Sequence, residues 1–273
     1  MATIDVARSA ASVSTRRTWT LALVGMLALA AWAVLAAWSA SPYARFLAHD
    51  GWSDLGPLAE LCRTIPEASV VVPALLQAIV WLLMITAMML PTTLPLLGTF
   101  SRITASRPDA GALHARAIAG YVLAWMGFGL VAYALDLGVH AAFRSSGWLV
   151  AHGWVVGAAV LAGAGAFQFS ALKYRCLERC STPFGFVNAR WRGLHPAREA
   201  FRLGFDHGAF CVGCCWALML VTFVVGMGNF GAMLALAALM AAEKNLPSGR
   251  LFAAPVGVAL LAWAGAVTVA NLA

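Results

Sequence analysis

Long apolar stretches alternate with short polar ones along this chain, as in proteins whose helices cross a membrane. A helix needs about 20 mostly apolar residues to cross the hydrocarbon core, and residues 19–38 supply the first such stretch. No charged residue occurs from 210 to 242, which is too long for one span, and a Gly-Met-Gly-Asn sequence at 226–229 offers a break. The pattern therefore predicts an all-α, polytopic bundle of transmembrane helices with six to seven membrane segments.

The seven predicted segments form a single integral membrane domain that comprises the whole chain, residues 1–273. They cover residues 19–38, 70–100, 117–135, 148–172, 209–227, 229–243 and 251–270. A basic connection, residues 173–207, joins the fourth and fifth segments. If the apolar stretch after this connection formed one span instead of two, the bundle would have six.

Basic residues indicate the orientation, because Lys and Arg collect in cytoplasmic loops. With a cytoplasmic N-terminus and seven segments, 15 of the 18 basic residues fall on the cytoplasmic side. Only Arg45, Arg63 and Arg144 fall outside. Glu243 and Lys244 end the sixth segment, and we expect this charged helix end to face water.

The composition agrees with a membrane bundle. Hydrophobic residues make up 62% of the chain and charged residues 11%, against about half and a quarter in soluble domains. This balance excludes a soluble fold, a disordered chain and a disulfide-rich scaffold. The net charge of +7 comes from basic loop residues that set the orientation, and these residues can also bind anionic lipid headgroups. We expect the lipid bilayer as a partner, and no nucleic acid.

Five of the six cysteines lie where this topology places the cytoplasmic face. Cys176 and Cys180 follow the fourth segment, and Cys211, Cys214 and Cys215 begin the fifth. The cytoplasm is reducing, so free thiols rather than disulfides are expected. The remaining cysteine lies in the predicted outer loop.

The spacing places these thiols on two helical stripes. Cys176 and Cys180 are four residues apart, so both point from one face if the fourth helix continues past the membrane. His207 precedes the three cysteines of the fifth segment by 4, 7 and 8 residues, which is a single stripe. Thiolate and imidazole bind soft or borderline metals, so these six residues are candidate ligands for Cu(I), with Zn as the alternative. Nearby cations that favour thiolate are Lys173, Arg175, Arg179 and Arg202.

The second segment contributes a third group of candidate ligands. Met84 and Met88 are four residues apart near its predicted cytoplasmic end, and Met89 and Pro91 follow. Thioethers favour Cu(I), and the proline bends the helix in a way that opens a cavity. We therefore include Met84 and Met88 among the metal ligands.

If one metal site unites the two cysteine groups, their sulfurs must lie close together. Metal–sulfur bonds are about 2.3 Å long. A sulfur of Cys176 or Cys180 should then lie within about 8 Å of one in residues 211–215.

Three sequence blocks have a further significance. They are Ala-Met-Met-Leu-Pro at 87–91, the pair Cys176 and Cys180 after Leu-Lys at 172–173, and Cys-x-Gly-Cys-Cys-Trp-Ala-Leu-Met at 211–219. Together they resemble a bacterial family, the uncharacterised predicted metal-binding integral membrane proteins. The resemblance extends from the second segment to Lys244 and implies metal binding in a bacterial cytoplasmic (inner) membrane. Ser181 stands where that family usually has Arg, which removes no proposed ligand.

These residues favour a membrane protein that binds a soft ion through a Cys/His/Met cluster at its cytoplasmic side and transfers it. Such a protein need not be an enzyme, and we assign no catalytic residue. Two alternatives stay open. One is a membrane thiol–disulfide oxidoreductase that uses Cys211 and Cys214, whose spacing fits a redox pair. The other is a non-catalytic accessory subunit of a membrane complex. A protein partner and a homo-oligomer are also left open.

Overall fold

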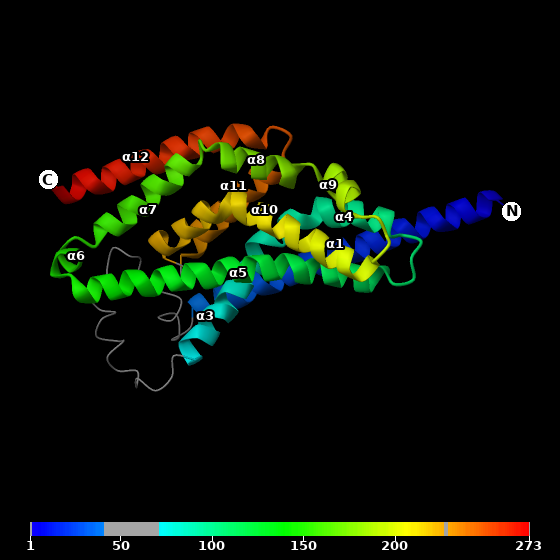
Figure 1. Ribbon diagram of the computed structural model, residues 1–273, viewed down its shortest axis with the longest axis horizontal. Coiled ribbons are helices and arrows are strands. Elements are labelled where there is room, and N and C mark those ends of the chain that lie inside the picture. Colours follow the sequence, from blue (N-terminus) through cyan, green and yellow to red (C-terminus); the bar gives the residue numbers. More distant parts are fainter. Residues whose placement is uncertain (1, 41–70, 227–228, 273) are drawn as a thin grey trace.

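The computed structural model describes residues 2–40, 71–226 and 229–272, and the regular structure of these residues is helical (Figure 1). The longest helices are α1 (Ala2–Ser39), α5 (Ala110–Ser145), α10 (Pro196–Val225) and α12 (Ala253–Leu272). Large apolar side chains point outward, and Leu29, Leu130 and Val269 are 70%, 68% and 67% exposed. Such a surface suits lipid rather than water. The sixth cysteine, Cys62, lies outside the described residues.

Four helical stretches in the described residues are long and apolar enough to cross a membrane. They are Leu21–Ser39, Ala110–Ser145, Pro196–Val225 and Gly249–Leu272. Two further spans result if each of two bent helix pairs is counted as one. The predicted all-α bundle of membrane helices is therefore confirmed, with four to six spans. α11 (Phe230–Asn245) has 16 residues, fewer than the roughly 20 of a full span, so the seventh segment and the orientation stay predictions.

The first bent pair changes direction by 44° around Pro91. α3 (Val71–Met84) continues into the π-helical turn η2 (Ile85–Met89), where the Leu90 N–H donates to the Ile85 carbonyl at 2.9 Å. The 3₁₀ turn η3 (Pro91–Thr93) then leads into α4 (Leu94–Ile103). Proline lacks an N–H and clashes with the preceding turn, and a π turn is a usual cause of a helix bend. The wider turn changes which side chains face the interior.

The second bent pair turns the chain by 64° between α7 (Trp154–Phe167) and α8 (Ala171–Ser181). The short α6 (Gly147–Ala151) precedes them. The Ser170 hydroxyl accepts a hydrogen bond from the Lys173 N–H at 3.1 Å, as serine does at the start of a helix. The fourth segment therefore does not continue as one straight helix into Cys176 and Cys180, as the predicted stripe assumed. A new helix begins, which carries Cys176 and Cys180 toward α10.

The predicted basic connection, residues 173–207, is mostly helical. It includes most of α8, the helix α9 (Pro183–Arg190) and the first turns of α10. Between α9 and α10 the Glu199 carboxylate accepts hydrogen bonds from the backbone N–H groups of residues 192–195, at 2.7 to 3.1 Å. These N–H groups lie just before α10, at a helix start where backbone donors often lack partners. By accepting all four hydrogen bonds, the carboxylate holds residues 192–195 in a tight turn.

α5 and α10 pack at the centre of the bundle because glycines let their backbones touch. A Cβ at Gly204 would lie 1.8 Å from the Ala117 carbonyl oxygen, and one at Gly120 would lie 2.2 Å from that of Phe201. Small residues permit such contact between helices in lipid. On the opposite side, η4 (Gly249–Phe252) leads into α12, which lies along α7 (Figure 1).

Replacing Gly204 with leucine should strongly destabilise the bundle, because the new side chain would overlap the Ala117 backbone. Overpacking costs about 1–3 kcal/mol, and more where backbone has to shift. We expect the melting temperature of the detergent-purified protein, followed by circular dichroism, to fall by about 5 °C or more. The control is Gly163→Leu, since a Cβ at Gly163 meets nothing within 4 Å. Equal melting of the two variants would contradict the close contact.

Candidate metal centre

Two cysteine groups that are distant in sequence meet where α8 contacts α10. Cys180 Sγ lies 3.6 Å from Cys211 Sγ, and both side chains are buried. A single metal site required a separation of no more than about 8 Å, and this prediction is confirmed. The contact depends on the 64° turn between α7 and α8, because a straight continuation of α7 would carry Cys180 away from α10.

His207 completes a group of three candidate ligand atoms. It precedes Cys211 by about one turn of α10, and the ligand atoms of Cys180, His207 and Cys211 all lie within 4.8 Å of one another. The histidine is 2% exposed, and its Nδ1 has no hydrogen-bond partner among the described residues. Buried polar atoms nearly always have a partner, so an unpaired imidazole nitrogen beside two thiols fits a ring that is kept for a metal.

Aromatic rings hold His207 in position. The Tyr121 ring of α5 lies 6.0 Å from the imidazole, and Phe186 of α9 meets it edge to face at 5.4 Å. The Arg190 guanidinium stacks 3.9 Å above the Phe186 ring and pairs with Asp206 of α10 at 2.8 Å. These contacts fasten α9 across α10 and cover one side of the three ligand atoms.

The other three described cysteines lie beside this group. The Cys214 thiol donates to the Cys211 carbonyl at 3.2 Å, and its sulfur lies 3.4 Å from that of Cys215. Cys176 packs on α10 at Gly213, where an added Cβ would lie 2.6 Å from the Cys176 sulfur. The five described thiols are all buried and free, so the structure gathers them between α8 and α10. A ligand role for Cys176, Cys214 and Cys215 stays a prediction.

A lysine that sequence reasoning missed is in direct contact with one of these thiols. Lys244 Nζ lies 3.4 Å from Cys211 Sγ, 3.3 Å from Thr92 Oγ1 and 3.6 Å from Met89 Sδ. The expectation that Glu243 and Lys244 face water is wrong, since they are 1% and 3% exposed. α11 ends inside the bundle, against α8 and η3. A charged pair after an apolar run has the same sequence pattern whether the helix ends in water or inside a bundle, so no local signal distinguishes this burial.

The methionines lie in the core close to this lysine. Met84 and Met88 are 0% and 2% exposed, but it is the Met89 thioether that contacts Lys244. The reason is the π-helical turn Ile85–Met89, because spacing by 3.6 residues no longer predicts which side chain faces inward. Metal ligation by Met84 and Met88 stays a prediction.

A buried ion pair attaches α8 to α11. Lys173 Nζ lies 2.8 and 2.9 Å from the two carboxylate oxygens of Glu243, and it also contacts the Gln168 side chain. Lys173 and Glu243 are 0% and 1% exposed. Lys173 is one of the cations expected to favour thiolate in the cysteine cluster, and its direct hydrogen-bond partners are Glu243 and Gln168. The pair positions the helix that carries Cys180 next to the one that carries Lys244.

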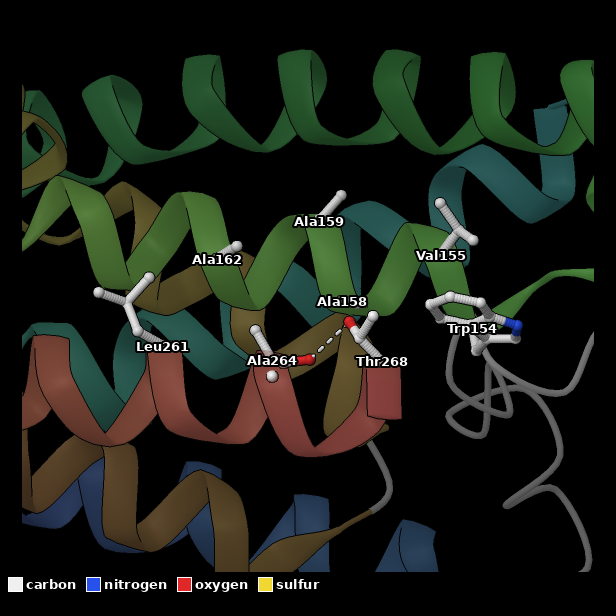
Figure 2. Close-up of a pocket in the computed structure, with 9 residues that line it drawn as sticks. Trp154, Val155, Ala158, Ala159, Ala162, Leu261, Ala264 and Thr268 are labelled. Atoms are coloured by element: carbon white, nitrogen blue, oxygen red, sulfur yellow. Dashed lines mark hydrogen bonds between the residues drawn. The ribbon is translucent and has the colours of Figure 1, made fainter. Parts of the chain in front are cut away.

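Two hollows elsewhere in the described structure have no cysteine or histidine in their linings. One of about 470 Å³ lies between α7 and α12 (Figure 2), where Thr268 bonds to the Ala264 carbonyl of its own helix. Another of about 440 Å³ lies among α5, α7 and α10. Their linings are mainly Ala, Gly, Val and Leu, with a tryptophan in each and no cysteine or histidine. The α8–α10 contact is therefore the better metal site.

Comparison with known proteins agrees with this chemistry. Residues 78–267 match the PpoB2 family, which is described as copper chaperone. No curated protein and no solved structure matched the chain. The matched region contains every candidate ligand, from Met84 to Cys215. The match agrees in kind with the metal-binding membrane family that the sequence resembles, and it identifies copper as the ion.

Replacing Lys173 with methionine should cost about 3–5 kcal/mol of stability, because Glu243 would stay buried without its partner. The double variant Lys173→Met/Glu243→Met should recover most of this loss, since two apolar side chains then replace two charges. Denaturant unfolding in detergent measures both. Arg107→Met breaks a surface pair with Asp109 and should change stability little. A Lys173→Met protein as stable as wild type would contradict a structural role for the pair.

Proposed function

The chain belongs to the copper chaperone family, and we propose that it holds Cu(I) between α8 and α10 and passes the ion on by exchange of ligands. The observation that supports this most directly is the buried group of Cys180, His207 and Cys211, with ligand atoms within 4.8 Å of one another. The protein is an integral membrane protein with several candidate spans. The exact ligands, the cytoplasmic position of the site and the bacterial inner membrane are parts of the proposal.

The donor set suits Cu(I) better than zinc. Thiolates select soft ions, and imidazole binds copper as well. Structural zinc sites almost always have four ligands in a tetrahedron, whereas the tightest group among the described residues has three. Cu(I) with the two thiolates of Cys180 and Cys211 and one neutral imidazole is therefore the complex that fits.

Lys244 would balance the charge of that complex. Cu(I) with two thiolates has a net charge of −1, and the site lies in a buried part of the bundle where an unpaired charge is costly. The Lys244 ammonium, 3.4 Å from Cys211 Sγ, makes the whole group neutral. Lys244 would thus contact a metal ligand rather than the metal itself, and removing such a group typically weakens metal binding.

Neighbouring thiols offer a route for transfer within the site. A three-coordinate ion has room for an incoming thiolate, which can bind before another ligand leaves. Cys214 and Cys215, with sulfurs 3.4 Å apart, lie one turn further along α10, and Cys176 faces the same helix. An ion held by Cys180 and Cys211 can thus pass to an adjacent thiol without leaving the protein.

Burial of the thiols disfavours the alternative of a thiol–disulfide oxidoreductase. Exchange requires that a thiolate of one protein reach a sulfur of the other. Cys211 and Cys214 are 0% and 1% exposed, and the Cys214 thiol is engaged by the Cys211 carbonyl. A small metal ion needs far less access than a protein disulfide.

Detergent-purified protein loaded anaerobically with Cu(I) should contain stoichiometric copper by mass spectrometry. Cys180→Ser and Cys211→Ser should each lose most of it, because a hydroxyl is a poor ligand for a soft ion. X-ray absorption should show sulfur and nitrogen neighbours in wild type and should lose the nitrogen in His207→Leu. Cys62→Ser, the same change in the predicted outer loop, is the matched control. Copper that is absent from wild type, or retained in both cysteine variants, would refute this site.

Lys244→Met should weaken Cu(I) binding by about 10- to 100-fold, the usual effect of removing a group that supports a metal ligand. Lys244→Arg keeps the charge and should lose much less. Competition with a chromophoric Cu(I) chelator of known affinity measures both variants. If Lys244→Met binds Cu(I) as tightly as wild type, the ammonium does not compensate the charge of the site.

A further inference from the structure

A hollow of about 490 Å³ is lined in part by residues that adjoin, along the chain, residues in contact with the thiol cluster. Its lining comes mainly from α4, with further residues from α1, η3, the start of α9 and the end of α11. The residues that matter here are Pro91, Gly98, Arg102, Pro183 and Asn245. Unlike the two apolar hollows elsewhere, this one has a guanidinium and a carboxamide in its lining, and both side chains are exposed.

The wall of this hollow and the wall of the metal site are made by the same chain segments. Pro91 immediately precedes Thr92, and Asn245 immediately follows Lys244. Thr92 and Lys244 contact each other at 3.3 Å, and Lys244 in turn contacts Cys211. Pro183 is three residues beyond Cys180. The residues that line the hollow are thus the chain neighbours of Thr92 and Lys244, which connect to the thiols through the contact between Lys244 and Cys211.

We propose that this hollow is the port through which Cu(I) enters and leaves the site, in complex with a small anionic thiol. The inference rests on the proposed function and adds the route and the kind of carrier. A volume of about 490 Å³ admits a small molecule and excludes a folded protein. Arg102 in the lining attracts an anionic complex, and Lys244, the residue before Asn245, favours a negative charge at Cys211 beyond it.

The transfer through this port is a ligand exchange without change of oxidation state. The bond between Cu(I) and the carrier sulfur breaks as a bond from Cu(I) to Cys211 Sγ forms. The carrier leaves as a thiol and takes the proton that the Cys211 thiol loses, and the proton of the Cys180 thiol is released to water as its own bond to Cu(I) forms. The Lys244 side chain is long and flexible, so it can swing from Thr92 to admit the ion and then return beside the thiolate.

Filling the port at Gly98 tests the proposal. A Cβ at Gly98 meets nothing within 4 Å, so Gly98→Leu and Gly98→Trp extend into the hollow without a backbone clash. Release of bound Cu(I) to an excess of the anionic chelator bicinchoninate, followed by absorbance, should slow by about tenfold or more in Gly98→Trp. The copper content at equilibrium should stay that of wild type. The matched control is Gly127→Trp on the exposed face of α5, where a Cβ also meets nothing within 4 Å.

A surface variant keeps the test decisive if Gly98→Trp does not fold. Arg102 is exposed at the rim, so Arg102→Glu should fold normally and slow exchange with the anionic chelator several-fold, with Arg102→Lys near wild type. Wild-type exchange rates in Gly98→Leu and Arg102→Glu, with copper still bound through Cys180 and Cys211, would overturn the port alone. Absence of copper from wild type would instead overturn the proposed function.

Discussion

Charges inside the bundle determine how the part that holds the buried thiols is assembled. An isolated ammonium or carboxylate is very costly in such surroundings, so each one has to meet a partner. Glu243 and Lys244 are neighbours on α11, and successive helical residues point about 100° apart. Glu243 therefore reaches Lys173 on α8, while Lys244 reaches Cys211 on α10. The end of α11 is thereby fixed between the two helices that carry the candidate ligands.

Two departures from straight helices make this arrangement possible. The turn between α7 and α8 lets Lys173 and Cys180, both on α8, meet α11 and α10 together. The bend at Pro91 places Thr92 beside Lys244. Without these two changes of direction, α8 would not bring Lys173 and Cys180 to α11 and α10, and Thr92 would not lie beside Lys244. The site is thus a consequence of where the helices break, and Pro91 and Ser170 are the residues that mark the breaks.

Local spacing predicted part of the site and long-range contacts decided the rest. His207 and Cys211 were predicted together because both lie on one face of one helix, and Cys180 because it shares a face with Cys176. Their convergence needed only that α8 lie against α10. Lys244 was missed because no local pattern distinguishes a charge that ends a helix in water from one buried against another helix. The choice between Met88 and Met89 depends on a π turn, which shifts the register by one residue and has no clear sequence signature.

The asymmetry of α10 favours transfer at one end over transport through the bundle. On the side of Cys211 that leads to the predicted cytoplasm lies His207, another candidate ligand. On the other side, beyond Cys215, the buried residues of α10 are almost all apolar, and Met219 supplies the one thioether among them. The Thr222 hydroxyl there is already engaged by the Met219 carbonyl. An ion that moved along α10 in this direction would exchange thiolate ligands for a single thioether among apolar side chains, which is costly for a cation in a buried site. The described part of α10 therefore supports an ion that enters and leaves by the same end, as a chaperone requires and a channel does not.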